Sequence, residues 1–239
     1  MFKDISMRLI QSKRVSPPLL ASALLFVGLF SFFLSDAFRA LDIFQTDKPF
    51  TVVLDAGHGG DDPGKVSASG VKEKEINLAI TLKCRTILEQ NGITVKLTRE
   101  DDRSLEDPSA TNKKASDLQN RKNFFLEENP DCVVSIHQNS FPDSSQHGAQ
   151  VFYPSSHEES KKLASFIQKQ TIHLTGEENR REIKPNSSYF LLRDNPIPTV
   201  IAEVCFLSNP SEAALITDEN IQEKAAFAIA MGIMQYLHS

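Results

Sequence analysis

Short apolar runs alternate with amphipathic stretches from residue 50 to residue 237, and this alternation limits the possible folds more than any other feature of the chain. A short apolar run closed by glycine, proline or polar residues is typical of a buried strand, whereas apolar residues three and four positions apart are typical of a helix. Strands and helices in alternation predict an α/β fold, a single layered domain with a mostly parallel central sheet flanked by helices on both faces. We expect strands at residues 50–54, 93–98, 132–136, 149–153, 189–192 and 199–204, and helices at residues 73–90, 117–128, 157–173 and 220–237.

Residues 1–40 differ from the rest of the chain, because basic residues precede an uncharged, apolar run at residues 15–35. This order is typical of secretory signals and of N-terminal membrane anchors. We therefore assign residues 1–40 to a signal or anchor, residues 41–49 to a linker and residues 50–239 to a folded domain that acts outside the cytoplasm. Small residues at 37 and 40 fit a cleavage site, but Arg39 makes it a poor one. This favours a retained anchor and leaves cleavage and secretion open.

The composition excludes some partners and some site chemistries. The formal net charge is −5, and no basic stripe carries interleaved aromatic residues, so we expect no nucleic-acid partner. Cys84, Cys132 and Cys205 lie inside apolar patterns and lack metal-ligand spacing, which predicts small buried side chains, although a disulfide stays possible in an exported protein. Residues 99–116 and 175–188 are polar and irregular, and their role stays open.

Four polar residues stand where an α/β fold places its sites, at or near the carboxyl ends of strands. His58 follows the first strand, Glu73 opens the first helix, His137 ends a central strand, and Glu203 interrupts a late strand. Two imidazoles and one carboxylate are a common catalytic zinc set, and a second carboxylate can carry protons. His58 alone also fits a turn residue, and Glu73 alone fits a helix N-terminus. His137 and Glu203 are harder to explain structurally, because a polar group in a buried strand is costly.

Four motifs place these residues in a wider pattern. They are VLDAGHGG with DPG at residues 53–60 and 62–64, GVKEKEINL at residues 70–78, SIHQN at residues 135–139 and AEVCFLSN at residues 202–209. In this order the motifs resemble the zinc-dependent N-acetylmuramoyl-L-alanine amidases of the amidase-3 family. The resemblance covers residues 50–237 and implies that residues 50–239 are a zinc amidase catalytic domain.

The resemblance also implies roles for single residues. It gives His58, Glu73 and His137 as the ligands of Zn²⁺ and Glu203 as the catalytic carboxylate. Asn77 and Asn139 also match motif positions, and we interpret both as structural residues or as hydrogen-bonding supports of the ligands. Arg193 fits a substrate contact and an ordinary surface residue equally well. Cys205 is a departure, since the family often has glycine there.

The implied reaction is hydrolysis of the amide bond between the lactyl group of N-acetylmuramic acid and L-alanine in peptidoglycan. A hydrophobic N-terminal segment followed by the catalytic domain is similar to the sporulation amidases that help to form muramic-lactam in spore cortex. That subgroup implies a cortex substrate, a muramic-acid deacetylase that acts downstream and an accessory protein that activates the enzyme. Two other classes stay open: a zinc peptidase on another exported substrate, and a peptidoglycan-binding protein without catalytic activity.

Overall fold

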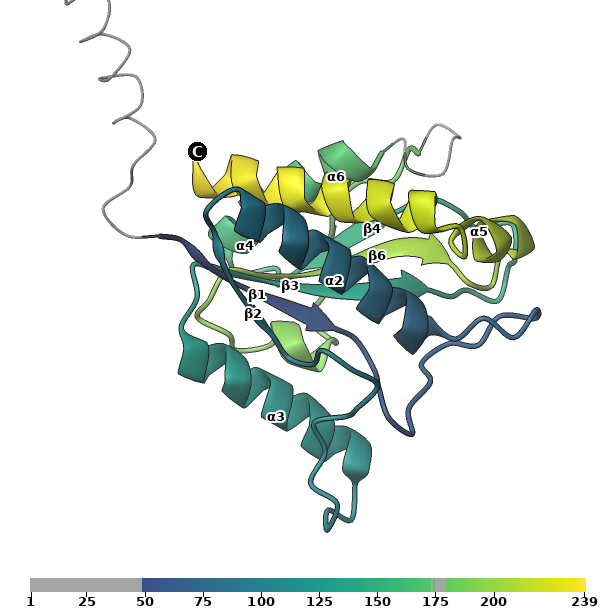
Figure 1. Cartoon of the computed structure of the whole chain (residues 1–239), viewed down its shortest axis with the longest axis horizontal. Helices are drawn as coiled ribbons and strands as arrows, with labels where there is room; N and C mark the ends of the chain where they lie inside the picture. The colour runs from purple at the N-terminus through teal and green to yellow at the C-terminus, as the bar shows by residue number, and fades with distance from the viewer. Residues whose placement is uncertain (1–48, 173, 175–178) are drawn as a thin grey trace, which may run out of the picture. The chain divides into compact units, whose positions relative to one another are not determined.

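A six-stranded sheet forms the centre of the computed structural model (Figure 1). Its strand order is β2-β1-β3-β6-β4-β5, and all neighbouring strands run parallel except β4 and β6, which run antiparallel. The mostly parallel sheet expected from the sequence is therefore confirmed. The strands are β1 (Thr51–Ala56), β2 (Thr94–Leu97), β3 (Cys132–Asn139), β4 (Gln150–Tyr153), β5 (Lys184–Pro185) and β6 (Thr199–Phe206).

The structure describes residues 49–172, 174 and 179–239. In these ranges, no helix combines the length and the apolar character that a membrane crossing requires. The proposed signal or anchor at residues 1–40, the linker up to residue 48 and part of the irregular stretch at 175–188 lie outside the described residues.

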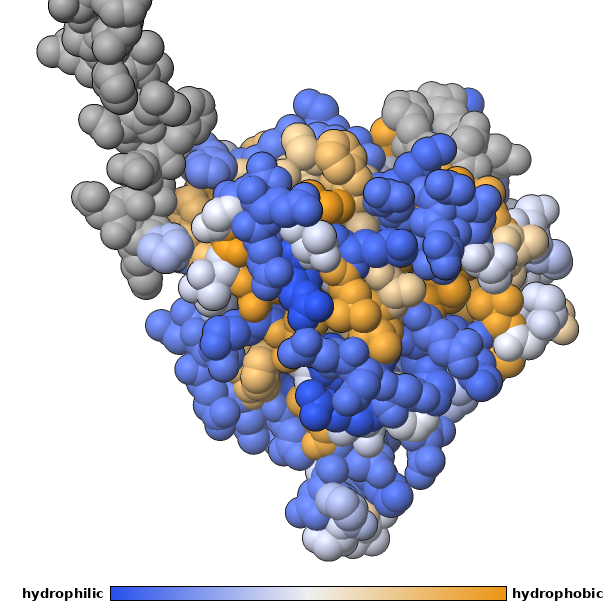
Figure 2. All heavy atoms as spheres, in the orientation of Figure 1, coloured by the Kyte–Doolittle hydropathy of each residue, from blue (hydrophilic) through white to orange (hydrophobic). Residues whose placement is uncertain are grey.

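Helices cover both faces of the sheet. One face carries α2 (Glu73–Gln90), α4 (Glu158–Thr171) and α6 (Glu219–Leu237), and the other carries α3 (Lys113–Glu128) and the 3-10 helix η1 (Phe190–Leu192) (Figure 1). The short helix α5 (Pro210–Leu215) follows β6. Figure 2 shows the face with α2 and α6 from outside, where hydrophilic residues cover most of the surface and hydrophobic residues show between them.

The core consists of two main layers, one on each side of the sheet. Val52 and Leu54 of β1 belong to the large cluster under α2, α4 and α6, whereas Val53 packs with Phe125 of α3 on the opposite side. Because successive side chains of a strand point to opposite faces, burial on both faces explains why the strand sequences are continuously apolar. The three cysteines are buried and free, which confirms that they act as small apolar side chains.

Two expected elements differ in the structure, and two short elements, β5 and α5, were not expected from the sequence. The strand expected at residues 189–192 is wrong, because Phe190–Leu192 forms a 3-10 helix. The Asn186 side chain accepts hydrogen bonds from the backbone N–H groups of Ser188 and Tyr189 and turns the chain there. The helix expected from residue 117 begins at Lys113, since the Asn112 side chain caps it by accepting a hydrogen bond from the N–H of Ala115.

Candidate metal and catalytic site

His58, Glu73 and His137 converge at one edge of the sheet. Each offers one ligand atom, and these three atoms lie within 4.8 Å of one another. Oε1 of Glu73 lies 3.2 Å from Nε2 of His58 and 2.9 Å from Nδ1 of His137. The side chains come from the loop after β1, the first residue of α2 and the carboxyl-terminal half of β3. The group is therefore assembled from three separate elements, as the strand-end rule predicts.

The loop that carries His58 has an unusual backbone. His58 adopts a φ of 63°, a left-handed conformation that is uncommon for a residue with a side chain. Two buried arginines hold the carbonyl oxygens of this loop. The Arg121 guanidinium donates hydrogen bonds to the oxygens of Ala56 (2.9 Å) and His58 (2.7 Å), and Arg99 donates to those of Ala56 (2.9 Å) and Gly57 (3.1 Å). These contacts fix the backbone from which the His58 imidazole projects.

A buried carboxylate balances Arg121. Asp55 of β1 is fully buried and forms an ion pair with Arg121, and it also accepts hydrogen bonds from the hydroxyl groups of Thr98 and Ser135. Burial by itself raises the pKa of Asp55, but the Arg121 charge and the two hydroxyl groups hold it below its ordinary value. Asp55 is therefore an ionised structural group beneath the site.

Two glycines leave room for the converging side chains. A Cβ atom at Gly57 would stand 2.2 Å from Cε1 of His137. A Cβ atom at Gly64 would stand 2.6 Å from Oε2 of Glu73 and equally close to Cδ2 of His58. Such distances are impossible for real atoms, so the ring and carboxylate positions depend on glycine at both places. The backbone at these two glycines therefore lies in direct contact with the side chains of His58, Glu73 and His137.

Neighbouring groups orient His58 and Glu73. Asp62 Oδ2 lies 2.8 Å from Nδ1 of His58, so Nε2 is the ring nitrogen that faces the other two side chains. Asn77 is fully buried, and its side-chain amide lies 3.3 Å from Oε1 of Glu73. The backbone N–H of Lys65 donates to Oε2 of Glu73 at 2.7 Å. Both imidazole and carboxylate thus have hydrogen-bonded supports, as metal ligands in proteins commonly do.

The electrostatics of the cluster favour an ionised carboxylate. Burial tends to raise the pKa of Glu73, but hydrogen bonds and attraction from His137 and His58 hold it far below its ordinary value. Burial tends to lower the pKa of His58, and the interactions with Glu73 and Asp62 override it and raise that pKa to about 8. An ionised carboxylate between two imidazoles can bind a cation together with them.

Glu203 lies next to His137 on the neighbouring strand. The two residues are register partners on β6 and β3, and Glu203 is only 8% exposed. Its Oε2 atom has no hydrogen-bond partner among the described residues. Burial raises the pKa of Glu203 to about 7, which the charge of His137 only partly opposes. A carboxyl group with such a pKa exchanges a proton readily near neutral pH.

A pocket of about 380 Å³ opens over these side chains. His58, Glu73, His137 and Glu203 all line it, so the structure brings together the four residues that the sequence singles out. Lys114 at the start of α3 and Tyr189 next to η1 also line it, and the sequence reasoning named neither. The Tyr189 hydroxyl opposes the rise in the pKa of Glu203, although burial has the larger effect.

Two other candidates are not among the residues that line the pocket. Asn139 is half-buried at the end of β3, where its side chain accepts a hydrogen bond from the N–H of Ser140 at 2.8 Å. Arg193 is exposed, and its guanidinium lies 5.4 Å from the ring centre of Phe190. The pocket lining includes neither residue. Cys205 is fully buried in the large core cluster and does not line the pocket.

Comparisons with known proteins agree with this geometry. Residues 52–235 match the amidase-3 family, which is described as N-acetylmuramoyl-L-alanine amidase. The germination-specific N-acetylmuramoyl-L-alanine amidase of Bacillus subtilis is 33% identical over 217 residues, which are 89% of this chain and 90% of that protein.

Two solved structures show the same fold. The CwlD amidase from Clostridioides difficile, solved in complex with the GerS lipoprotein, is 46% identical, with a TM-score of 0.76, and the match covers 79% of this chain and 98% of that one. The catalytic domain of CwlV, an amidase from Bacillus (Paenibacillus) polymyxa var. colistinus, is 36% identical with a TM-score of 0.69 and the same coverage. The match over almost the whole described part of the chain shows that this protein belongs to the amidase-3 family of N-acetylmuramoyl-L-alanine amidases.

Proposed function

We propose that this amidase uses zinc to hydrolyse the bond between the lactyl group of N-acetylmuramic acid and L-alanine in peptidoglycan. The observation that carries the proposal is the convergence of His58, Glu73 and His137 within 4.8 Å, opposite a buried carboxyl group at Glu203. Residues 50–239 form the catalytic domain in this proposal. Residues 1–40 are the export signal or membrane anchor, and residues 41–49 are the linker, so that the enzyme acts outside the cytoplasm.

The side chains present fit a zinc ion. Two imidazole nitrogens and one carboxylate oxygen are a donor set that catalytic zinc sites use, with a further position left for water or substrate. The glycines at positions 57 and 64 leave space for the donors, and Oε2 of Glu203 is a buried polar atom beside them that has no hydrogen-bond partner in the described part of the chain. Zinc held by His58, Glu73 and His137 would supply Lewis-acid chemistry, which polarises a carbonyl group and brings the pKa of water to about 7.

Glu203 carries the proton in the proposed mechanism. Its carboxylate takes a proton from the attacking water and delivers it to the amine of L-alanine as that amine departs. In the metal-free protein burial raises the pKa of Glu203 to about 7, which is near the pH at which the group must accept a proton and then lose it. No covalent intermediate is needed, and the three cysteines are buried away from the pocket.

The surrounding residues hold the reacting groups in place. Asp62 and Asn77 support His58 and Glu73 through the hydrogen bonds described above. Asn139 acts structurally in this proposal, since its carbonyl oxygen accepts a hydrogen bond from the N–H of Leu207 at 2.9 Å and so joins β3 to the end of β6. Arg193 is exposed beside Phe190, which lines the pocket, so a surface role and a substrate contact both stay open for it.

We further propose that the substrate is spore cortex and that the enzyme removes stem peptides there during muramic-lactam formation in sporulation. The similarity to a germination-specific amidase supports a cortex role. The similarity to an amidase that was solved in complex with a lipoprotein supports an accessory activating partner for this chain as well. Lactam formation also needs a muramic-acid deacetylase to act on the product.

The first experiment measures zinc content and the release of stem peptides from cortex and from vegetative peptidoglycan. It uses the full chain with zinc supplied, beside Glu203→Gln. Zinc in both proteins with release by the wild type alone would support the assigned roles. Zinc without release in either protein would contradict the proposal in favour of a different exported substrate or a non-catalytic wall-binding role, unless an added lipoprotein partner restores release. Absence of zinc would contradict the ligand assignment.

A further inference from the structure

Lys114 is the one lysine or arginine among the described residues that line the pocket. It is the second residue of α3 and also lines a smaller cavity of about 40 Å³ between His58 and Arg121. Its position therefore places a positive charge at the junction of two hollows that both reach the proposed ligand His58. The rest of the charge in the pocket comes from two carboxyl groups, Glu73 and Glu203, and two imidazoles.

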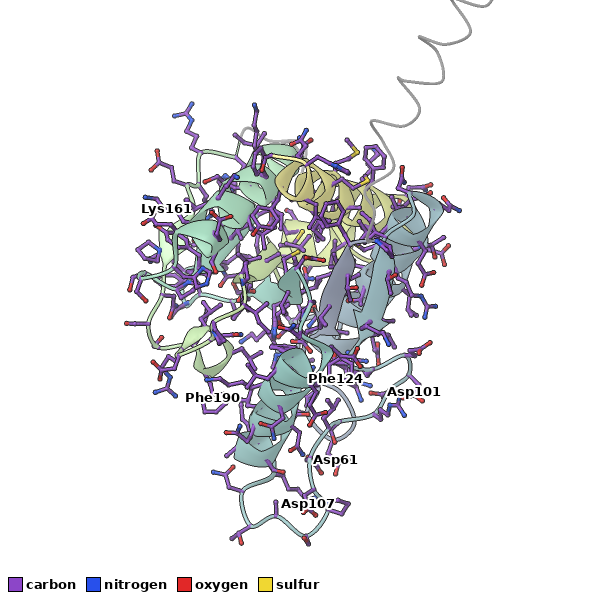
Figure 3. All side chains as sticks on the ribbon, turned by 90° about the vertical axis from the view of Figure 1, so that its left-hand side faces the viewer. Asp61, Asp101, Asp107, Phe124, Lys161 and Phe190 are labelled. Carbon is purple, nitrogen blue, oxygen red and sulfur yellow. The ribbon has the colours of Figure 1, made fainter. Side chains whose placement is uncertain are left out.

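The Lys114 ammonium group makes no hydrogen bond or ion pair with the residues that the structure describes. Its neighbour Lys113 is different, because its ammonium lies 3.1 Å from a carboxylate oxygen of Glu106 and 3.9 Å from one of Asp61. Figure 3 labels Asp61 beside the loop that leads into α3. Two consecutive lysines on one helix thus face different surroundings. Lys113 contacts two carboxylates, whereas the exposed Lys114 lines the pocket and has no ion-pair partner among the described residues.

The substrate of this family carries a carboxylate that a positive charge such as the Lys114 ammonium can bind. Next to L-alanine, the stem peptide has a D-glutamate that is joined through its γ-carboxyl group, so its α-carboxylate stays free unless the cell amidates it. That carboxylate lies one residue beyond the scissile amide bond. Glu73 and Glu203 would repel an anion that enters the pocket, whereas an ammonium with free donors attracts it and forms charge-assisted hydrogen bonds.

We propose that Lys114 binds the free α-carboxylate of the second stem-peptide residue and so gives the enzyme a preference for stem peptides that are not amidated there. The inference rests on the proposed amidase function and names a specificity-determining residue for it. Against the effect of burial, the hydrogen bond to His58 and, to a smaller extent, the charge of Lys114 help to lower the pKa of the neighbouring Asp62. Lys114 and Asp62 form no direct ion pair, however: Oδ2 of Asp62 contacts His58, and Oδ1 accepts a hydrogen bond from the N–H of Gly64.

The test compares two soluble disaccharide peptides that differ only in whether the second residue carries a carboxylate or an amide. The full chain with zinc supplied is measured as wild type, Lys114→Ala, Lys114→Glu and the matched control Lys113→Ala. A hydrogen bond between charged groups contributes to the binding free energy of the substrate. We therefore expect the KM of the wild type to be about tenfold lower for the carboxylate substrate than for the amide substrate. Lys114→Ala loses this preference, Lys114→Glu reverses it, and Lys113→Ala keeps it.

Binding gives a second measurement that does not depend on turnover. In a Glu203→Gln background, calorimetry should show the same preference for the carboxylate peptide and its loss on adding Lys114→Ala. A wild type without preference, or a Lys114→Ala variant that keeps the wild-type ratio while the wild type releases peptide, would overturn this inference alone. A wild type that cleaves neither peptide and binds neither would overturn the proposed function, and this inference with it.

Discussion

The substitution Arg121→Met tests whether the buried ion pair beneath the site shapes the loop that carries His58. Methionine keeps much of the length of the side chain and removes its charge and its hydrogen-bond donors. Asp55 would then be a fully buried carboxylate without its cationic partner, and the carbonyl oxygens of Ala56 and His58 would each lose a donor.

The expected cost follows from that burial. Removing one partner of a buried ion pair typically costs about 3–5 kcal/mol, because it leaves an uncompensated charge. A domain has only about 5–15 kcal/mol of total stability, so Arg121→Met should lose a large part of it. The matched control is Arg85→Met, since Arg85 pairs at 2.8 Å with Glu100, whose side chain is 62% exposed. An exposed pair of this kind contributes at most about 1 kcal/mol.

Urea unfolding of the zinc-free proteins at pH 7.5, followed by circular dichroism, gives both free energies of unfolding. The difference between wild type and Arg121→Met should also depend on pH. The folded-state pKa of Asp55 lies below its unfolded value of about 3.9, so the stabilisation is fully present above that value. It is lost as the pH falls through the lower, folded-state pKa, and the two unfolding curves should therefore approach each other in acid.

Two results would refute this reasoning. One is a loss in Arg121→Met no larger than that in Arg85→Met, which would mean that water or a rearranged side chain neutralises Asp55. The other is a loss of stability in Arg121→Met while the folded variant keeps the zinc affinity of the wild type. That result would mean that the conformation of His58 does not depend on the ion pair. The double variant with Asp55→Asn should lose less than the sum of the single losses, because the two residues interact directly.

Three further predictions concern the site itself. Asp62→Ala should lower zinc affinity about 10–100-fold in a chelator-competition assay, since it frees Nδ1 of His58, and unchanged affinity would argue against this support. Gly57→Ala should lower affinity more than Asp62→Ala, because the added Cβ would stand 2.2 Å from the His137 ring; a smaller effect would show that the ring moves without cost. In zinc-free protein, stability should fall as the pH rises from 4.5 toward the raised Glu203 pKa of about 7, and Glu203→Gln should remove this decline in urea unfolding; an identical pH profile in both proteins would contradict it.

The sequence predicts the layers of this fold and the main site residues for the same reason. Strand ends are marked by a change from apolar to polar residues, and parallel strands bring such ends to one edge of a sheet. His137 and Glu203 stand out locally against an apolar run, whereas His58 and Glu73 gain their meaning only from the motifs around them. The 3-10 helix at Phe190–Leu192 gives no such signal, because Leu191 and Leu192 are both buried and an apolar pair of this kind fits a strand equally well.

The residues that the sequence reasoning missed depend on contacts between distant parts of the chain. Arg121 is one helical turn from Leu118 and from Phe125, so it lies on the apolar side of α3, and a charge on that side was the available signal. The buried Arg121 guanidinium donates its hydrogen bonds to the carbonyl oxygens of Ala56 and His58, which lie more than sixty residues earlier in the chain. Lys114 carried no signal at all, because its place in the pocket depends on where α3 begins.

Asp55 and Glu203 show how one sheet gives two buried carboxyl groups opposite tasks. Both interrupt an apolar strand, and burial alone would raise the pKa of each. Asp55 is matched by Arg121 and by two hydroxyl groups, which keep it ionised and unreactive. Glu203 has no ion pair among the described residues and an unpartnered oxygen, so burial prevails and its pKa rises to about 7. The partners, rather than the residue type or its depth, therefore decide which carboxyl group stabilises the site and which one moves protons in it.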